Sequence, residues 1–179
     1  MKTLTLLRHA KSGWDDPSLS DAARPLNAKG RRAAAAIGRH LRATGARFDH
    51  VIASPAVRVR QTIDAVASGY GAKPAPVWDQ RLYLASDSSL IDVIRGLPDD
   101  RASVILVGHN PGLEDLVLAL VPSGSGPLRD EAALKYPTAT IAELRFEIDH
   151  WAEIAPGTAT LITFTRPRDL DSTLGPDEE

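Results

Sequence analysis

The sequence contains no cysteine, and this absence excludes several kinds of chemistry at once. A chain without thiols forms no disulfide, holds no thiolate-bound metal and uses no cysteine nucleophile. Disulfides belong mainly to secreted and periplasmic proteins, so their absence is consistent with a reducing compartment. We therefore expect a cytoplasmic protein whose chemistry depends on other side chains.

An excess of one charge and long hydrophobic runs are also missing. The 21 basic and 23 acidic residues nearly cancel, which favours neither nucleic acid nor a membrane as a partner but leaves room for a local basic pocket. The apolar start of the chain stops at Arg8, too early for a signal peptide, and no run approaches the roughly 20 residues that span a membrane. The expected protein is soluble and unprocessed.

What the chain does contain is an alternation of short apolar strands and amphipathic helices. Its 179 residues, 43% of them hydrophobic, fit one folded domain. This order predicts an α/β fold with three αβα layers: a mainly parallel sheet with helices on both faces and an antiparallel edge. Strands are expected at 3–7, 50–53, 76–78, 103–107, 139–148 and 159–165, and helices at 28–44, 56–67, 88–96 and 112–121.

Some segments show no such periodicity. Residues 10–26 and 122–137 are predicted to be long irregular connections, which in compact domains are usually functional or mobile. Residues 1–166 are expected to form the single domain. Residues 167–179 are polar, acidic and rich in turn formers, and are expected to be a mobile tail.

Three of the predicted strands end in sequences that carry histidine or arginine. The first ends at Arg8 and His9. The second is followed, in the first turn of the next helix, by Arg58, and the strand at 103–107 is followed by His109. The carboxyl ends of parallel strands share one edge of a sheet, and ligands bind there. We therefore expect these four side chains to meet in one crevice.

Two of the turns at this edge follow the same sequence pattern, a small polar residue followed by proline. Ser54-Pro55 and Asn110-Pro111 each place a capping side chain before a proline, which predicts that a helix begins there. Helix starts direct backbone N–H groups and a positive dipole end at a ligand, and arginine forks match phosphate oxygens. The predicted ligand is a small dianion, most simply a phosphoryl group.

Each of these residues has an ordinary structural explanation when it is taken alone. Arg8 can be a surface charge that closes an edge strand, and Arg58 can be a solvated helix residue. The turn at 108–111 can be no more than a capped helix start. Their joint placement favours a site instead. The remaining histidines do not share it and are interpreted as structural or exposed: His40, His50 and His150.

The ordered motifs of the chain carry a resemblance to a known family. They are Leu6-Leu7-Arg8-His9-Ala10, Lys11-Ser12-x-Trp14, Pro25-Leu26-Asn27-x-x-Gly30, Ser54-Pro55-x-x-Arg58-x-x-Gln61-Thr62 and Val107-Gly108-His109-Asn110-Pro111. At these separations the set resembles the histidine phosphatase superfamily, the phosphoglycerate-mutase-like proteins. Within it, the chain is most similar to the small SixA-type phosphohistidine phosphatases. The resemblance runs from Leu4 to about Asn110, with a weaker likeness at 135–138.

The resemblance implies a role for each of the convergent residues. His9 matches the nucleophile, which becomes a transient phosphohistidine, and Arg8, Arg58 and His109 match the phosphate pocket. Flanking cations would keep the attacking imidazole unprotonated, and a protonated His109 could donate to a phosphoryl oxygen. Phosphoryl transfer of this kind depends on positioning and charge, so no metal or other cofactor is expected. Further candidates for binding the substrate are Ser12, Trp14 and Asn110.

The sequence departs from the broad family in two ways, at Ala10 and in the absence of a glutamate acid. Ala10 replaces the usual glycine, which SixA-type members tolerate. Larger phosphomonoesterases of the superfamily carry a glutamate general acid after the third strand, but residues 79–87 contain no glutamate, and Asp79 and Asp87 are expected to be surface residues. An ester oxygen leaves slowly without an acid, whereas the nitrogen of a phosphoramidate can be protonated beforehand. The missing glutamate therefore favours a phosphohistidine or another activated phosphoryl substrate.

The short chain favours the same substrate, because it leaves no room for a large cap over the pocket. An open pocket can admit a histidine presented by another protein, such as a phosphotransfer domain or carrier, with the two irregular segments as its rim. Trp14 and Tyr83 are candidate contacts there, although Trp14 can equally pack in the core, and Lys11 and Ser12 can reach phosphate or solvent.

Three alternative functions remain open from the sequence. One is a phosphatase of a small phosphomonoester, and another is a phosphate-binding module without catalysis. A metallohydrolase is the least favoured, because both arginines would repel the cation and no metal-ligand spacing such as His-Glu-x-x-His occurs. Its ligands would be His9, His109, Asp15 and Asp16.

Overall fold

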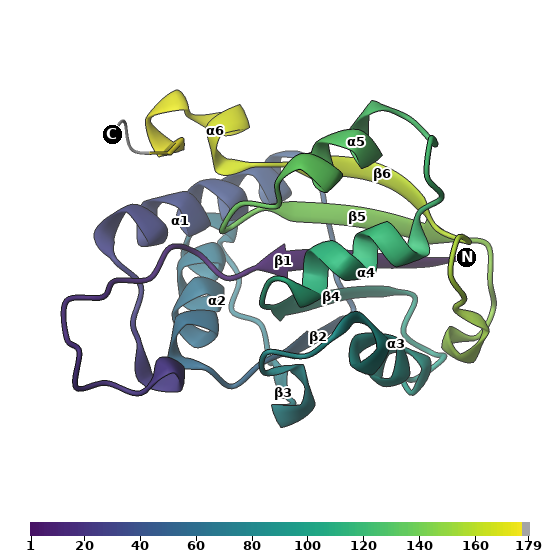
Figure 1. The fold of residues 1–179 in the computed structure, drawn as a ribbon, viewed down its shortest axis with the longest axis horizontal. Coiled ribbons are helices and arrows are strands. Elements are labelled where there is room, and N and C mark those ends of the chain that lie inside the picture. Colours follow the sequence, from purple (N-terminus) through teal and green to yellow (C-terminus); the bar gives the residue numbers. More distant parts are fainter. Residues whose placement is uncertain (177–179) are drawn as a thin grey trace.

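The computed structural model describes residues 1–176, which contain one sheet with helices on both faces (Figure 1). The strands follow one another across the sheet in the order β3-β2-β4-β1-β5-β6. β3, β2, β4 and β1 pair in parallel, and β5 runs antiparallel to both β1 and β6. This confirms the mainly parallel sheet with an antiparallel edge. The strands are β1 (Lys2–Arg8), β2 (His50–Ala53), β3 (Val77–Trp78), β4 (Ser103–Gly108), β5 (Ile141–Phe146) and β6 (Thr160–Thr165).

The helices form the two outer layers of the domain. α1 (Ala28–Ala43) and α2 (Val57–Tyr70) cover one face of the sheet, and α3 (Asp87–Arg95), α4 (Gly112–Leu120) and α5 (Pro127–Leu134) cover the other (Figure 1). α6 (Pro167–Leu170) lies beside α1. Short 3-10 turns complete the list: η1 (Asp21–Ala23), η2 (Gln80–Leu82), η3 (Trp151–Glu153) and η4 (Ser172–Leu174).

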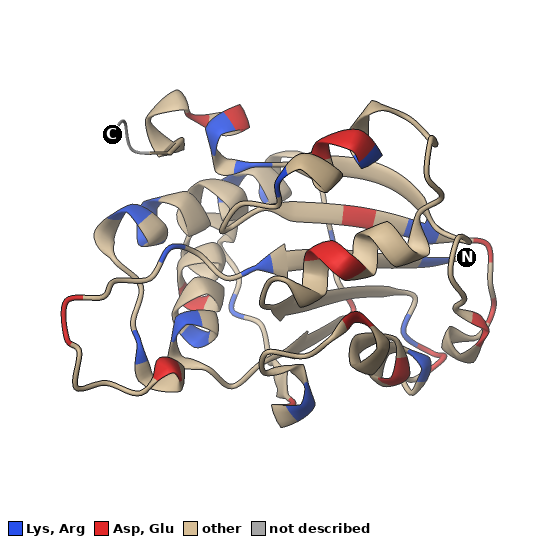
Figure 2. Ribbon diagram, viewed as in Figure 1, with Lys and Arg blue, Asp and Glu red and all other residues tan. Residues whose placement is uncertain are grey.

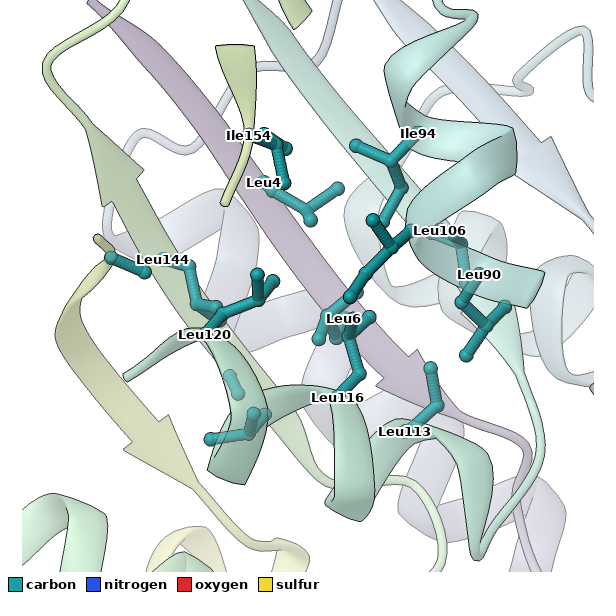
Figure 3. Packing of buried hydrophobic residues seen from close by; sticks show 14 of the residues in the cluster. Leu4, Leu6, Leu90, Ile94, Leu106, Leu113, Leu116, Leu120, Leu144 and Ile154 are labelled. Carbon is teal, nitrogen blue, oxygen red and sulfur yellow. The ribbon is translucent and has the colours of Figure 1, made fainter. Parts of the chain in front are cut away.

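The sheet is buried on both faces, which explains its apolar central strands. Successive side chains of a strand point to opposite faces, so Leu4 and Leu6 of β1 enter the core under α3 and α4 (Figure 3). Leu7 points the other way and packs in the core under α1 and α2. β1 lies between β4 and β5, so its carboxyl end opens at the middle of the sheet edge. That position places Arg8 and His9 at the centre of any site there.

Two segments contain more helix than the sequence analysis predicts. The connection 122–137, expected to be irregular, contains α5, which starts with Pro127 after Gly126 and buries Ala132. The segment expected to be a mobile tail forms α6 and η4 against α1, with Pro167 buried. The last three residues of that tail, 177–179, lie outside the described residues.

The helices after β2 and β4 start within one residue of their predicted positions, but the role of Ser54 differs from the prediction. α2 begins at Val57, and Ser54 is not its cap: the Ser54 hydroxyl lies 2.8 Å from a ring nitrogen of His109. α4 begins at Gly112, as predicted, and the Asn110 side chain accepts a bond from the Glu114 N–H at 3.2 Å. Asn110 therefore binds a backbone N–H of the first turn of α4, as predicted, whereas the Ser54 hydroxyl contacts His109 instead of capping α2.

Within residues 1–176 no helix is long and apolar enough to cross a membrane. The same part of the chain contains no group of three or more His, Cys, Asp or Glu side chains arranged to hold a metal ion.

Candidate active site

His9 lies immediately after β1 and has one defined ring proton. The residue is 9% exposed, and its backbone N–H donates to the Gly108 carbonyl of the neighbouring strand. Its Nδ1 lies 2.7 Å from the Ala10 carbonyl oxygen, which can only accept, so Nδ1 carries the proton. The lone pair of the ring therefore belongs to Nε2, which is the atom able to attack phosphorus.

The surroundings of His9 keep its ring neutral. Burial, together with the nearby His109, Arg58 and Arg8, lowers the pKa of His9 to about 3, although the hydrogen bond to Ala10 opposes the shift. Because the free side chain titrates near 6.5, the folded protein holds an unprotonated nucleophile at neutral pH. A nucleophilic imidazole requires this form.

The motif around Arg58 ties α2 to the end of β1. The Thr62 hydroxyl donates to the Arg58 carbonyl at 2.7 Å and accepts from the Ala10 N–H at 2.9 Å. The side chain of Gln61 accepts from the Leu26 N–H at 2.8 Å, which attaches the loop 10–26 to the same helix. The spacing of this motif therefore fixes Arg58 relative to His9, since one helical turn carries all three side chains.

His109 is held between Arg58 and Ser54. Arg58 is 3% exposed, and its Nη2 lies 3.3 Å from His109 Nδ1. Since a guanidinium only donates, Nδ1 accepts, and the ring proton on Nε2 is donated to the Ser54 hydroxyl at 2.8 Å. Burial and then Arg58 lower the pKa of His109 to about 4. The ring is therefore neutral in this structure, whereas the sequence analysis considers a protonated one. Its centroid lies 5.3 Å from that of His9.

Arg8 is held by a backbone carbonyl 128 residues further along the chain. Its Nη1 donates to the Tyr136 carbonyl at 2.8 Å, and Tyr136 is buried, with its hydroxyl donating to the Leu6 carbonyl at 2.6 Å. The side-chain amide of Asn110 donates to the same Tyr136 carbonyl at 3.1 Å. The predicted binding residue Asn110 therefore holds the loop that fixes Arg8.

Three of the four convergent residues, Arg8, His9 and Arg58, line a hollow of about 360 Å³, which we call the reaction hollow, while His109 lies behind Arg58 and is not part of its lining. Among the described residues that line it, none is acidic. Ser12 is one of them, and its hydroxyl accepts from Arg24 at 2.5 Å. Trp14 is 75% exposed, with the Arg24 guanidinium stacked 3.2 Å from its ring centroid, so it lies on the rim and not in the core. The lining residues are Arg8, His9, Lys11, Ser12, Trp14, Arg24, Arg58 and Thr138.

One carboxylate at the site was missed by the sequence analysis. Asp21, in η1, accepts from Arg58 Nη2 at 2.9 Å through its side chain and from Arg58 Nη1 at 2.7 Å through its backbone carbonyl. The hydroxyl of Tyr83 donates to the same carboxylate, and its ring lies edge-on to His109. The hydrogen bond from Tyr83, with Arg58 and Arg24, lowers the pKa of Asp21. No local sequence signal marks it, because the contact depends on how the loop folds over α2.

The two aspartates discussed from sequence lie elsewhere. Asp79 pairs with Arg81 at 2.6 Å and caps η2, and Asp87 is the first residue of α3. Neither lines the reaction hollow.

A phosphoglycerate-mutase-like α/β fold with histidine and arginine at the carboxyl edge of its sheet defines the class of protein. The sequence profile of the histidine phosphatase superfamily (branch 1) matches residues 4–82. The SixA protein from Nakamurella multipartitia is 30% identical, with a TM-score of 0.79 over 93% of this chain and 96% of that one. The chain belongs to the histidine phosphatase superfamily and is a hydrolase of the phosphatase class.

Other similar proteins agree over nearly the whole chain. The SixA protein from Agrobacterium tumefaciens is 28% identical, with a TM-score of 0.78 over 93% of this chain and 98% of that one. Uncharacterized protein Rv1276c of Mycobacterium tuberculosis is 36% identical over 164 residues, covering 90% of this chain and all of the relative. The likeness to the SixA structures therefore extends beyond the segment that the superfamily profile matches.

Proposed function

We propose that the protein is a phosphohistidine phosphatase, which removes the phosphoryl group from a histidine of a partner protein through a covalent intermediate on His9. One observation carries the proposal: an unprotonated imidazole nitrogen lies beside Arg8 and Arg58 in a hollow whose described lining has no acid. The partner would be a phosphotransfer domain or carrier protein in the cytoplasm. The names of the SixA neighbours point to the same substrate class.

The first step moves the phosphoryl group between two imidazoles. His9 Nε2 attacks phosphorus while the P–N bond to the substrate histidine breaks, and the arginines stabilise the charge on the equatorial oxygens. The substrate ring, protonated on its other nitrogen, leaves as a neutral imidazole. His9 keeps its own proton on Nδ1, where the Ala10 carbonyl stabilises the charge that develops on the ring. The step therefore needs no proton donor.

The second step returns the enzyme to its starting form. Water attacks phosphorus, the bond between phosphorus and His9 Nε2 breaks, and the electron pair returns to the neutral ring. The phosphate released carries the added oxygen, and its extra proton passes to solvent. No metal or other cofactor takes part in this scheme.

The carboxyl group that contacts Arg58 favours this substrate over an alkyl ester. An alkyl ester needs a protonated acid that donates a proton to its leaving oxygen. Such an acid contributes roughly 10²–10⁴-fold in rate. Asp21 is the carboxyl group in contact with Arg58, but its pKa is lowered, so it is a poor proton donor. A small phosphomonoester is therefore the weaker candidate substrate.

The test compares the wild type with His9→Ala on a phosphohistidine-carrying protein and on an alkyl phosphate. We expect the wild type to dephosphorylate the phosphoprotein preferentially, with and without a chelator, and to form an acid-labile phosphoryl label on His9. His9→Ala should lose turnover and label together. Retained turnover in His9→Ala would reject the mechanism, and a strong preference for the alkyl phosphate would reject the substrate.

A further inference from the structure

The face of the sheet under α1 and α2 holds a second hollow of about 380 Å³, which we call the apolar hollow. It lies between α2 and the strands β1, β2 and β4, and all of its lining side chains are hydrocarbon except those of Arg47, Tyr70 and Lys73. Small-molecule sites commonly measure about 300–1,000 Å³ and are mostly apolar. The apolar hollow therefore has the size and the lining of a site for a small apolar group.

The exposure of the lining residues shows which way the apolar hollow opens. Arg47, Ala72 and Lys73 are exposed and mark its mouth, whereas Leu7 and Val107, each 1% exposed, form its floor on β1 and β4. A ligand would therefore enter between the connection from α1 to β2 and the connection from α2 to β3, and would lie against the central strands of the sheet.

A third hollow, of about 340 Å³, adjoins that mouth, and we call it the basic hollow. Arg47 and Tyr70 line both hollows and so form their common boundary. The basic hollow adds Arg42, whose guanidinium lies beside Gly71: a Cβ built on this glycine would be 3.0 Å from Arg42 Nη1. Figure 2 shows blue segments in the connections from α1 to β2 and from α2 to β3. Cations therefore gather where the apolar hollow opens.

Acidic side chains leave the charge of these cations uncompensated. None of the residues that line the two hollows is acidic, and within residues 1–176 no ion pair includes Arg42, Arg47 or Lys73. Asp49 is close in sequence, but its carboxylate oxygens accept from two backbone N–H groups at the amino end of β4, at 2.9 and 3.1 Å. An apolar hollow with a positive mouth complements a ligand that has an apolar body and an anionic end.

We propose that the two hollows together bind an aliphatic carboxylate, with its hydrocarbon chain in the apolar hollow and its carboxylate among Arg42, Arg47 and Lys73. Neither hollow shares a lining residue with the reaction hollow. The inference is therefore independent of the proposed function and gives the protein a second binding site.

An unbranched chain suits the apolar hollow better than a peptide does. A peptide backbone brings N–H and C=O groups that lose their hydrogen bonds to water on burial. The one hydroxyl among the lining side chains, that of Tyr70, already donates to the Ala46 carbonyl at 2.5 Å. A hydrocarbon chain buries no polar group, and each methylene that enters tightens binding about 3- to 4-fold. At the mouth, the planar forks of the two arginines match a carboxylate.

The experiment measures the binding of octanoate, hexanoate and 1-octanol to the full-length protein by isothermal titration calorimetry. Octanoate should bind the wild type. Hexanoate, with the same carboxylate and a shorter chain, should bind about 3- to 4-fold more weakly for each methylene that it lacks. The uncharged 1-octanol, with the same chain length, should bind about 10-fold more weakly than octanoate.

Two variants test the two halves of the site. Arg42→Gln/Arg47→Gln should weaken octanoate about 10-fold, to the affinity of 1-octanol, and leave 1-octanol unchanged. Ala67→Phe places a ring in the apolar hollow and should abolish the binding of both. The matched control Arg31→Gln/Arg32→Gln removes the same charge from exposed positions of α1 outside both hollows and should bind octanoate as the wild type does.

Methyl NMR of the wild type locates the ligand without relying on a variant that must fold. Octanoate should shift the methyl signals of Ile63 and Ile105, which line the apolar hollow, and leave that of Ile94, in the core under α3 and α4, unchanged. The absence of saturable shifts at Ile63 and Ile105 would overturn the proposal. His9→Ala should bind octanoate as the wild type does, so a failure of the proposed function leaves this site standing.

Other results would name a different occupant and make the proposal wrong. Equal affinities of the wild type for octanoate and 1-octanol, or an unchanged octanoate affinity in Arg42→Gln/Arg47→Gln, would show that no anion is recognised. Tighter binding of octyl phosphate than of octanoate, lost in the same double variant, would assign the site to phosphate esters. A wild type that is dimeric in solution and becomes monomeric as Ala67→Phe would show that a second copy of the chain fills the apolar hollow.

Discussion

Asp21 changes the interpretation of the phosphate pocket at the scale of single residues. Its side chain and backbone carbonyl both accept from Arg58, so a carboxylate already lies on the guanidinium that would bind a phosphoryl oxygen. An arriving dianion meets this negative charge as a competitor. Asp21 is therefore expected to weaken the binding of phosphate and assist its release.

We predict that Asp21→Asn binds inorganic phosphate more tightly. Removing one negative charge a few ångströms from the anion should lower the inhibition constant of phosphate about 3- to 10-fold. The matched control is Asp16→Asn, an exposed aspartate of the same loop whose partner is Ser18. Inhibition constants measured from the hydrolysis of a phosphohistidine substrate give the answer, and a constant that stays the same or rises in Asp21→Asn would contradict this role.

The limits of sequence reasoning at this scale have a physical cause. His9, Arg8, Arg58 and His109 could be placed together because three strand ends of a parallel sheet share one edge. The partners of Arg58 and Arg8 could not be predicted from the sequence, because they come from folded loops. Asp21 belongs to η1, and the Tyr136 carbonyl belongs to the loop after α5. A carbonyl oxygen has no residue-type signature, so its role is invisible in a sequence.

Two helices of the same layer approach each other unusually closely, and this contact positions the site at the scale of elements. A Cβ built on Gly38 of α1 would lie 2.1 Å from the Val66 carbonyl oxygen of α2. A Cβ on Gly69 of α2 would meet the Ala35 carbonyl of α1 at the same distance. Both obstacles are backbone atoms, which cannot rotate away. The pair of glycines therefore sets the separation of α1 from the helix that carries Arg58.

We predict that Gly38→Ala destabilises the protein, although alanine is the better helix former by about 1 kcal/mol. Forcing the helices apart should cost more than the propensity gain, with a net loss of about 1–3 kcal/mol in the free energy of unfolding. Urea unfolding of Gly38→Ala beside Arg31→Ala, an exposed position on the same helix, measures it. A stabilised Gly38→Ala would show that α1 and α2 can separate freely.

The elements that sequence analysis missed are the ones that carry too little periodic signal. α1 to α4 present apolar stripes over two or more turns, and their predicted ranges agree with the structure to within a few residues. α6 spans four residues and is stabilised by the reciprocal contact between Arg166 and Asp169, which leaves no stripe to detect. α5 had one available signal, Pro127 directly after Gly126.

At the scale of the whole molecule, the two neutral histidines make the stability depend on pH. Their pKa values in the folded protein, about 3 for His9 and about 4 for His109, lie below the 6.5 of an unfolded chain. Between these limits the unfolded state binds more protons than the folded one, so acid favours unfolding. The stabilisation is complete above about pH 6.5 and is lost as the pH falls toward about 4 for His109 and toward about 3 for His9.

We predict that the free energy of unfolding decreases below pH 6.5 with a slope of up to about 1.4 kcal/mol per pH unit for each of these histidines. His9→Gln and His109→Gln, separately and together, should flatten the dependence, because glutamine takes up no proton. Urea unfolding at pH 7, 6 and 5 gives the slopes. Identical slopes in wild type and variants would show that the rings are protonated in the folded protein.

The position of the chain ends has a practical consequence for anyone who handles this protein. Met1 lies at the amino end of β1, whereas α6 and η4 lie toward the opposite end of the molecule (Figure 1) and line a hollow of about 550 Å³ together with Arg8. A tag fused to the carboxyl end of the sequence follows η4 by only a few residues, so a histidine-rich tag adds imidazoles to the part of the chain that follows this hollow. Purification handles and surface-coupling chemistry therefore belong before Met1.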